Sequence, residues 1–170
     1  MIKQDISENQ ARIAYLAIGS NLGKRINNIE RAKFLLISNG IRIVETSSYY
    51  ETLSWPDKSK PKFLNIVVQV KVISSPNKLI KILKKIEKQL GRKKNTKNSP
   101  RECDIDIIDY DSKISSGTLI IPHERMHNRN FVLFPLYEID KNWIHPKFRI
   151  SIKKLIISLS IKDIRSIKQI

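Results

Sequence analysis

The amino-acid sequence predicts an α+β fold of the ferredoxin-like, split βαβ type, a mainly antiparallel sheet with helices packed on it. The first observation behind this is the order of apolar patterns, which reads strand, helix, strand, strand, helix, strand. The second is the length of 170 residues, which suits a single domain over 1–170. The third is that hydrophobic residues reach 41% but aromatic residues only 7%, so aliphatic side chains must fill most of the core.

The first half of the chain supplies two strands and a helix before a long loop. A short apolar run over 13–18 predicts a buried strand, and Asn21 or a neighbour is expected to cap the helix that follows. Apolar residues then recur at helical spacing over 26–37. β-branched and aromatic residues predict a strand over 41–50, whereas two prolines and little periodicity predict a loop over 51–62.

The second half adds another helix and the remaining strands. Gly91 marks the end of that helix, because glycine is favoured just past a helix C-terminus. Residues 1–10 are expected to form a polar arm and residues 151–170 a C-terminal extension. The expected elements are a strand over 63–73, a helix over 76–90, a strand over 103–110, a helix over 131–139, an extended segment over 143–150 and an amphipathic helix in 151–170.

The composition limits where the protein works and what it binds. Its single cysteine, Cys103, excludes an intramolecular disulfide and fits a reducing compartment. No apolar run approaches the roughly 18 to 20 residues that span a bilayer, so we expect a cytoplasmic protein without a membrane partner. The formal net charge of +16 has three explanations that charge alone does not separate: codon bias, an anionic ligand such as a nucleotide, and a nucleic acid.

The sharpest local signal is a pair of aspartates in the strand expected over 103–110. Because side chains alternate between the faces of a strand, Asp104 and Asp106 share one face, about 6.6 Å apart, while Ile105 and Ile107 point into the core. Two such carboxylates can share magnesium ions about 3.5–4 Å apart, the spacing of two-metal phosphoryl-transfer sites. The alternative is a solvated strand edge, but two aspartates on one face repel each other without a cation.

A basic segment over 92–101 leads directly into this strand. It contains Arg92, Lys97 and Arg101 and no acidic residue. Positive charge, metal ions and a polyphosphate would therefore converge beside the aspartates, as phosphoryl transfer requires. An exposed lysine-rich loop is the plainer alternative. The chain has no glycine-rich Walker loop, so nucleotide chemistry would need another design.

Aromatic and amide residues could form a pocket for a flat heterocycle. Phe63 and Asn65 share one face of a strand, Trp55 lies in the long loop, and Phe131 follows Arg129. Core packing is the ordinary role of each ring taken alone, but an inward-facing amide needs a hydrogen-bond partner. The sequence thus offers two rings and an amide as a binding wall.

Two histidines lie in an irregular stretch before residue 130. His123 and His127 have the spacing of two zinc ligands on a helix, but neighbouring proline and asparagine residues favour a loop. We expect instead that His123 and Arg129 lie near phosphate oxygens.

Six groups of motifs occur in a fixed order and spacing. They are Ala17–Gly23, Ser47–Thr52, Phe63–Asn65, Ile86–Arg92, Pro100–Ile107, and Ile121–His123 with Asn128–Leu136. Together they resemble one family, 6-hydroxymethyl-7,8-dihydropterin pyrophosphokinase (HPPK) of folate biosynthesis, over roughly residues 12 to 150. Each motif is modest alone, but their order makes the resemblance strong.

The resemblance implies the fold given above and a transfer of diphosphate from ATP to the hydroxymethyl group of 6-hydroxymethyl-7,8-dihydropterin, which releases AMP. It implies two Mg²⁺ ions on Asp104 and Asp106, which with Arg92 and Arg101 form the expected catalytic set. The residues expected around ATP are Glu87, Arg92, Lys97, Arg101, Ile107, His123 and Arg129, and those expected around the pterin are Thr52, Trp55, Phe63, Asn65 and Phe131. We expect a monomer that binds these small molecules and no nucleic acid.

The sequence departs from the family pattern at three places. The segment 92–101 is one residue short and carries lysines where arginines are usual, which keeps the charge but loses the two-pronged geometry of the guanidinium. Leu53-Ser54-Trp55 stands where Pro-Pro-Leu or similar is common, and Phe63 stands where tyrosine is frequent. Stacking at Phe63 survives without the hydroxyl.

The main rival reading is a nucleic-acid-binding module of the same fold. The charge of +16 supports it. The aromatic run of an RNA-recognition strand is missing, however, and Asp104 and Asp106 would repel phosphates without a metal. A different metal-dependent phosphotransferase of similar fold would differ only in its substrate.

Overall fold

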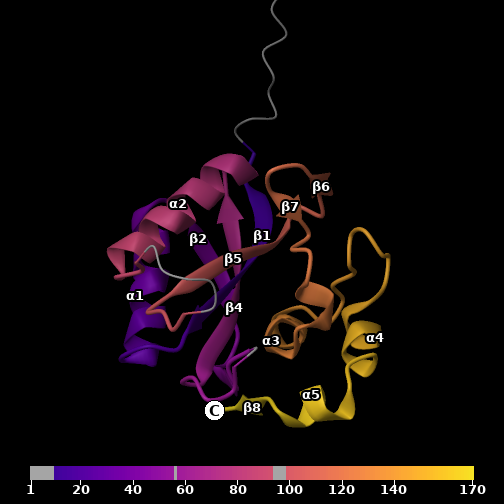
Figure 1. The fold of residues 1–170 in the computed structure, drawn as a ribbon. Helices are drawn as coiled ribbons and strands as arrows, with labels where there is room; N and C mark the ends of the chain where they lie inside the picture. The colour runs from indigo at the N-terminus through magenta and orange to yellow at the C-terminus, as the bar shows by residue number, and fades with distance from the viewer. Residues whose placement is uncertain (1–9, 56, 94–98) are drawn as a thin grey trace, which may run out of the picture.

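A computed structural model describes residues 10–55, 57–93 and 99–170 (Figure 1). From β1 to β5 the elements follow the expected strand, helix, strand, strand, helix, strand order, with the second strand divided into β2 and β3. The elements are β1 (Arg12–Ser20), α1 (Arg25–Ser38), β2 (Arg42–Thr46), β3 (Tyr50–Thr52), β4 (Phe63–Val72), α2 (Pro76–Gln89), β5 (Asp104–Tyr110), β6 (Ser115–Ser116), β7 (Ile120–Ile121), the 3-10 helix η2 (Met126–Asn128), α3 (Asn130–Ile139), α4 (Ile152–Ile157), α5 (Ile161–Arg165) and β8 (Lys168–Gln169).

The main sheet has the order β5-β1-β4-β3-β8, and β2 pairs with β4 beside β3. Every pairing in it is antiparallel. The two central strands, β1 and β4, are thus the first and third of the split βαβ pattern, as a ferredoxin-like fold requires. The predicted fold class is confirmed.

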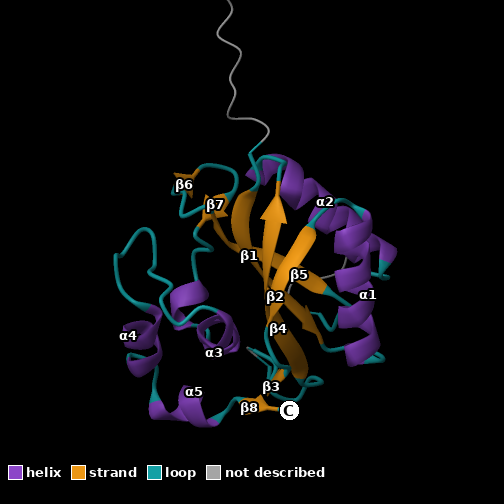
Figure 2. Cartoon of the chain, turned by 180° about the vertical axis from the view of Figure 1, so that it is seen from behind, coloured by secondary structure: helices purple, strands orange, loops and turns teal. Residues whose placement is uncertain are grey.

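Helices α1 and α2 lie together on one face of this sheet (Figure 2). Alternate residues of the strands point to that face and are buried against the helices. The core between these layers includes Leu16, Ile18, Leu64, Ile66, Val68, Ile105 and Ile107 from the sheet, Ile29, Ala32 and Leu36 from α1, and Leu79, Leu83 and Ile86 from α2. Aliphatic side chains fill this core, as the composition predicted.

Part of the opposite face is covered by α3 and α4, which form a second, smaller core. Its members include Tyr15, Val67 and Ile108 from the sheet and Val132, Leu133 and Leu136 from α3. Helix α3 is held to β3 near its C-terminal end, where Glu138 accepts from the Tyr50 hydroxyl over 2.8 Å. The sheet therefore has one face for stability and, at one end of the other face, room for a site.

The strand expected over 41–50 is in fact two strands. Ser47 interrupts the ladder: the Val67 amide donates to Ser47 Oγ over 3.0 Å, and the Ser47 amide donates to the Val67 carbonyl over 3.0 Å. The chain turns away over the next residues and pairs with β4 again at Tyr50. Glu51 and Thr52 consequently belong to β3 and not to the loop expected over 51–62.

The tail over 151–170 is not one amphipathic helix. Ser151 and Ser160 each cap a short helix by accepting a hydrogen bond from the amide three residues on, and these two caps divide the segment into α4 and α5. The chain ends in β8, which pairs with β3. The segment expected to be extended over 143–150 consists mostly of turns, with one bridge between Ile144 and Ser151.

Two further expectations concern single features. Asn21 does not cap α1, whose N-terminal boundary residue is Lys24 without a side-chain hydrogen bond. Within the described ranges, no helix is long and apolar enough to cross a membrane.

Candidate active site

The sheet register places the two aspartates and the binding wall on one face. Asp104 pairs with Gly19, Gly19 pairs with Asn65, and Asn65 pairs with Tyr50, so these residues form a row across four strands. Asp104 and Asn65 are two strands apart, or about 10 Å. The side chains of Asp104 and Asp106 are 22% and 33% exposed, whereas their neighbours are buried beneath α1 and α2. The predicted alternation of β5 is confirmed.

Asp104 is held by two arginines. Arg92 Nη1 makes a close ion pair with Asp104 Oδ1, and Arg101 Nε lies 3.4 Å from Asp104 Oδ2 without the geometry of a hydrogen bond. Burial opposes ionisation of this carboxyl, but the charges of Arg101 and Arg92 outweigh it and hold the pKa of Asp104 below its usual value. The carboxylate is therefore ionised and ready to bind a cation.

Glu87 of α2 supports this arrangement from the core side. Its side chain is 2% exposed, and Glu87 Oε1 accepts from the Ile105 amide over 2.7 Å and pairs with Arg92 Nη1 at 2.7 Å and Lys84 Nζ at 3.0 Å. Burial raises the pKa of Glu87, and the charge of Lys84 and the Ile105 amide only partly offset this. Glu87 thus joins α2, β5 and Arg92 through one oxygen atom.

Asp106 faces His123 and Arg129. His123 Nε2 and Arg129 Nη1 each lie 3.8 Å from Asp106 Oδ2. The Arg125 amide donates to His123 Nδ1 over 3.2 Å, which assigns the ring proton of a neutral His123 to Nε2. Burial lowers the pKa of His123 despite the neighbouring Asp106. The neutral imidazole therefore presents an N–H donor, and not a base, toward Asp106.

The expected pterin wall is formed by β4 and β3. Asn65 Nδ2 donates to Thr52 Oγ1 over 3.1 Å, and both residues are buried. A Cβ atom on Gly19 would lie 2.9 Å from Asn65 Oδ1 and 3.4 Å from Phe63 Cδ1. The absence of a side chain at Gly19 therefore leaves room for the amide and the ring of this wall.

Arginine side chains link the rings to the aspartates. The Arg101 guanidinium carbon lies 5.6 Å from the centre of the Phe63 ring, and that of Arg129 lies 5.4 Å from the centre of the Phe131 ring. Arg101 also faces Asp104, as Arg129 faces Asp106. Each ring thus contacts an arginine that also faces one of the two aspartates. The expected pterin wall and the expected metal site are therefore adjacent.

Asn21 was missed as a site residue by sequence reasoning. It is 3% exposed, and its Nδ2 donates to Ser54 Oγ at 3.3 Å and the Pro61 carbonyl at 3.2 Å, while its Oδ1 accepts from the Arg101 amide at 2.8 Å. This amide fastens the loop after β3 to the segment before β5. The only sequence signal was its place in the motif Ala17–Gly23, where a capping role was expected.

The remaining three expected site residues are a lysine that is not described, an exposed tryptophan and a buried isoleucine. Lys97 lies outside the described residues. The Trp55 side chain is 70% exposed, while its neighbour Ser54 is buried. The Ile107 side chain is buried in the core beneath α1 and α2, on the face opposite the aspartates.

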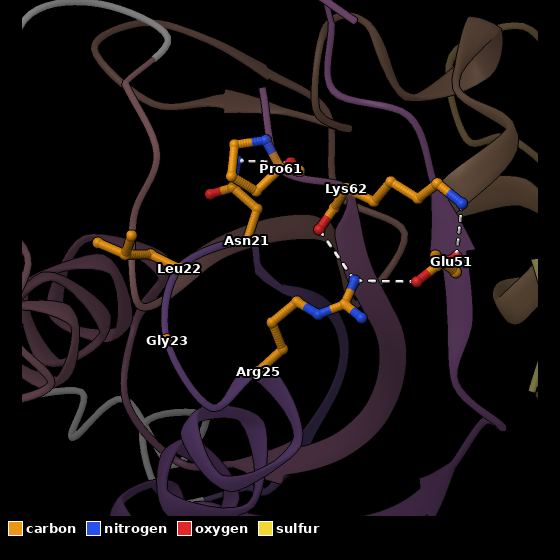
Figure 3. Close-up of a pocket in the computed structure, with 7 residues that line it drawn as sticks. All are labelled: Asn21, Leu22, Gly23, Arg25, Glu51, Pro61 and Lys62. Carbon is orange, nitrogen blue, oxygen red and sulfur yellow. Dashed lines mark hydrogen bonds and ion pairs between the residues drawn. The ribbon is translucent and has the colours of Figure 1, made fainter. Parts of the chain in front are cut away.

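A separate hollow of about 360 Å³ opens beside the end of β1 (Figure 3). Arg25 reaches across it to donate to Glu51 Oε1 and the Lys62 carbonyl, both over 3.0 Å, and Lys62 Nζ lies 3.1 Å from Glu51 Oε2. None of the expected site residues lines it: its lining residues are Asn21, Leu22, Gly23, Arg25, Glu51, Pro61 and Lys62. These contacts brace β3 from the side of α1.

The donor set at the aspartates fits magnesium. Two aspartate side chains on one half-buried strand face offer hard oxygen ligands, which this ion prefers. Within 10–55, 57–93 and 99–170, no three histidine, cysteine, aspartate or glutamate side chains gather as a metal site. Magnesium commonly takes one or two carboxylates and completes its coordination with phosphate oxygens and water, so the two aspartates suffice only together with a phosphate ligand.

Comparison with known proteins identifies the family. The sequence model for 7,8-dihydro-6-hydroxymethylpterin-pyrophosphokinase (HPPK) matches residues 15–141. A protein of Aquifex aeolicus named 2-amino-4-hydroxy-6-hydroxymethyldihydropteridine pyrophosphokinase is 39% identical over 141 residues, which are 82% of this chain and 88% of the relative. A Bacillus subtilis protein of the same name is 38% identical over 129 residues, 75% of this chain and 77% of the relative.

Other similar proteins are longer. The folic acid synthesis protein of Pneumocystis carinii is 38% identical over 161 residues, which are 94% of this chain but 22% of that protein. The wild-type HPPK-DHPS of Plasmodium falciparum with pterin and p-hydroxybenzoate shares the fold, with a TM-score of 0.72 at 16% identity over 95% of this chain. The chain spans 47% of that structure's length. The extent of the family match and the identity to relatives of similar length show that this chain belongs to the 7,8-dihydro-6-hydroxymethylpterin-pyrophosphokinase family.

Proposed function

We propose that this pyrophosphokinase holds two magnesium ions on Asp104 and Asp106 and binds the pterin against Phe63, Asn65 and Phe131. The family's reaction takes diphosphate from ATP to the hydroxymethyl group of 6-hydroxymethyl-7,8-dihydropterin. The observation that carries the proposal is the register of the sheet. It puts Asp104 and Asn65 about 10 Å apart on one face of the sheet, with Asp106 and Phe63 on the same face.

In this proposal the bound magnesium ions supply positive charge to the phosphate oxygens of ATP. The side chains of Arg101 and Arg129 lie between the carboxylates and the rings, Arg92 lies beside Asp104, and all three would hold the remaining phosphate charge. His123 would donate its Nε2 proton as a hydrogen bond to a phosphate oxygen. Each contact strengthens as negative charge develops on the leaving group.

The pterin side of the proposal assigns recognition and positioning. Phe63 and Phe131 offer ring faces for stacking, while Asn65, fixed by Thr52, offers an amide to the edge of the heterocycle. Trp55, which is exposed, is included among the pterin-binding residues only because of its position in the loop. Positioning of the hydroxymethyl oxygen for in-line attack would supply much of the rate enhancement.

The reaction balances without a further co-reactant. The hydroxymethyl oxygen attacks the β-phosphorus of ATP, and the bond from that phosphorus to the oxygen bridging the α- and β-phosphates breaks. AMP leaves with the bridging oxygen, and the hydroxyl proton is released to water. His123 presents its protonated nitrogen and would not act as the base, so in this proposal positioning and charge carry the step.

Calorimetry with 6-hydroxymethylpterin tests the assignment. The pterin is titrated with and without magnesium and a non-hydrolysable ATP analogue, into the wild type and into Asp104→Asn with Asp106→Asn. Asp111→Asn is the matched control, because Asp111 follows the same strand, pairs with Arg12 and has a φ of 55°, which asparagine tolerates. AMP formation that requires the pterin is measured in parallel.

We expect pterin affinity to rise with the magnesium nucleotide in the wild type and the control, and the double variant to lose that rise and AMP formation. Retention of the rise in the double variant would refute the metal assignment. Absence of pterin binding under every condition would refute the substrate assignment.

We further propose that residues 1–170 act as one pyrophosphokinase domain, monomeric and cytoplasmic. The tail supports the first part, because α4 packs in the same core as α3 and β8 extends the sheet. Cys103, buried as a free thiol, supports a reducing compartment. Sedimentation of the purified chain tests the oligomeric state, and a stable dimer would contradict it.

A further inference from the structure

The last eleven residues cross from one wall of the site to the other. Residues 160–170, here called the C-terminal strap, contain α5 and β8 and run from α4 along one edge of the molecule to β3 (Figure 1). The middle of the strap contacts the first residue of α3, and its C-terminal end pairs with β3. These two elements carry Phe131 and Thr52, which the proposed function places around the pterin.

The contact with α3 is made through Asn130. This residue is 8% exposed, and its Nδ2 donates to the Asp163 carbonyl over 2.7 Å and to Ser166 Oγ over 3.0 Å. Its Oδ1 accepts from the Phe131 amide over 2.7 Å. One buried amide thus ties the strap to the backbone of Phe131, the residue whose ring lies beside Arg129.

The contact with β3 is a short antiparallel ladder. Gln169 pairs with Tyr50 and Lys168 with Glu51, and the Ile170 amide donates to the Tyr49 carbonyl over 3.0 Å. Without β8, the outer edge of β3 would be free, and the strand would keep its pairing with β4 and the hydrogen bond from Tyr50 to Glu138 of α3. Thr52, at its end, accepts the hydrogen bond that orients Asn65.

Polar contacts, and not core burial, hold the strap. No residue of α5 is buried, and Ile161 and Ile170 are 70% and 56% exposed. Cutting the strap would therefore uncover little apolar surface and should leave both cores intact. An element that adds little to the cores but joins two parts of a site is suited to positioning.

We propose that the C-terminal strap, anchored on Asn130, is a positioning element that sets the distance between the two pterin-binding walls, α3 with Phe131 and β3 with Thr52. The proposal rests on the proposed function, because it assigns no substrate of its own. The hydrogen bonds of Asn130 and of β8 reach α5, Phe131 and β3, and among the described residues none of them reaches a metal ligand or the side chain of an expected phosphate contact. Their loss should weaken pterin binding while nucleotide binding stays.

Two variants of the full chain test this. The first lacks residues 168–170 and so loses β8. The second is Asn130→Ser, which keeps a small, neutral, polar residue at the first position of α3 but is too short to bridge to Asp163 and Ser166. The matched control, Lys168→Ala with Gln169→Ala, removes side chains from β8 but keeps its backbone pairing. Thermal unfolding confirms that each variant folds.

Calorimetry with 6-hydroxymethylpterin and Mg-nucleotide analogue, and steady-state kinetics, are the readouts. We expect pterin Kd and pterin KM to rise about five- to tenfold in both variants, with the nucleotide Kd within about twofold and the control unchanged. If the wild type binds the pterin, unchanged pterin affinity in both variants overturns the proposed role of the strap. A loss of nucleotide affinity equal to the loss of pterin affinity overturns it as well. Absence of pterin binding by the wild type overturns the proposed function and the strap with it.

Discussion

Replacement of Gly19 by alanine is the sharpest test of the binding wall. The alanine Cβ would stand 2.9 Å from Asn65 Oδ1 and 3.4 Å from Phe63 Cδ1, both side-chain atoms of that wall. Carbon–oxygen contacts under 3.0 Å are not tolerated, so the amide must move by several tenths of an ångström. The backbone of Gly19 is in a strand and lacks a positive φ, so alanine itself adopts it without strain.

The expected change in the free energy of unfolding is the sum of two opposed contributions. Alanine in place of glycine in a strand gains about 0.5–1 kcal/mol from the unfolded chain. Overpacking at the amide costs about 1–3 kcal/mol. We therefore expect the free energy of unfolding to fall by between zero and about 2.5 kcal/mol. Displacement of Asn65 also strains its 3.1 Å hydrogen bond to Thr52, and loss of one oriented amide should weaken pterin binding about tenfold, or 1.4 kcal/mol.

Urea unfolding and pterin calorimetry with the Mg-nucleotide analogue measure the two quantities separately. Gly117→Ala is the control, because a Cβ there would meet no atom within 4 Å. Pterin affinity equal to that of the wild type in Gly19→Ala would refute the reasoning that Gly19 makes room for the wall. A comparable loss of nucleotide affinity would refute it as well, since the clash involves only the wall.

The remaining predictions concern buried polar groups. Asn21→Ala leaves the Arg101 amide without its acceptor, so the free energy of unfolding should fall by about 1–3 kcal/mol and both pterin and nucleotide should bind more weakly. Wild-type affinity for both ligands, measured by calorimetry, would contradict this. Glu87→Ala removes the acceptor of the Ile105 amide and should cost more stability in urea unfolding than Glu87→Gln, which keeps an oxygen there; equal losses would show that the acceptor is unimportant. Burial lowers the pKa of His145 to about 4, below its ordinary value near 6.5, so the unfolded chain binds this proton more tightly. The contribution of His145 to the free energy of unfolding is full above pH 6.5 and is lost as the pH falls toward 4, by on the order of 2 kcal/mol. When unfolding is measured at pH 7 and pH 4.5, His145→Asn should show a smaller loss of stability at the lower pH than the wild type.

Alternation along one strand was enough to predict that the two aspartates lie on one face of the sheet. Side chains of a strand point to opposite faces, so Asp104 and Asp106 had to lie together once the buried isoleucines were assigned to the core. The same rule placed Phe63 and Asn65 on one face. The helices α1 and α2 could also be predicted from the sequence, because each carries an apolar stripe and ends near a glycine.

Other features depend on contacts between segments far apart in the chain, which periodicity does not report. The role of Asn21 comes from Pro61 and Arg101, forty and eighty residues away. The division of β2 from β3 comes from a serine hydroxyl that takes one place in the ladder of β4. The tail alternates isoleucine with polar residues, a pattern compatible with a helix or a strand. Its two serine caps and its pairing with β3 decided between these outcomes.

The ion pairs around the two aspartates have a consequence for how nucleotide enters. Three guanidinium groups face three carboxylates there: Arg92, Arg101 and Arg129 against Glu87, Asp104 and Asp106. With Lys84, which pairs with Glu87, these groups carry one net positive charge, whereas ATP with the two magnesium ions proposed carries none. Binding would then exchange partners, with metal on the carboxylates and phosphate on the arginines, and the neutral magnesium nucleotide would bring no net charge to the site. A chain of net charge +16 would consequently bind its nucleotide with little sensitivity to moderate salt, in contrast to the steep dependence that counterion release gives a nucleic acid.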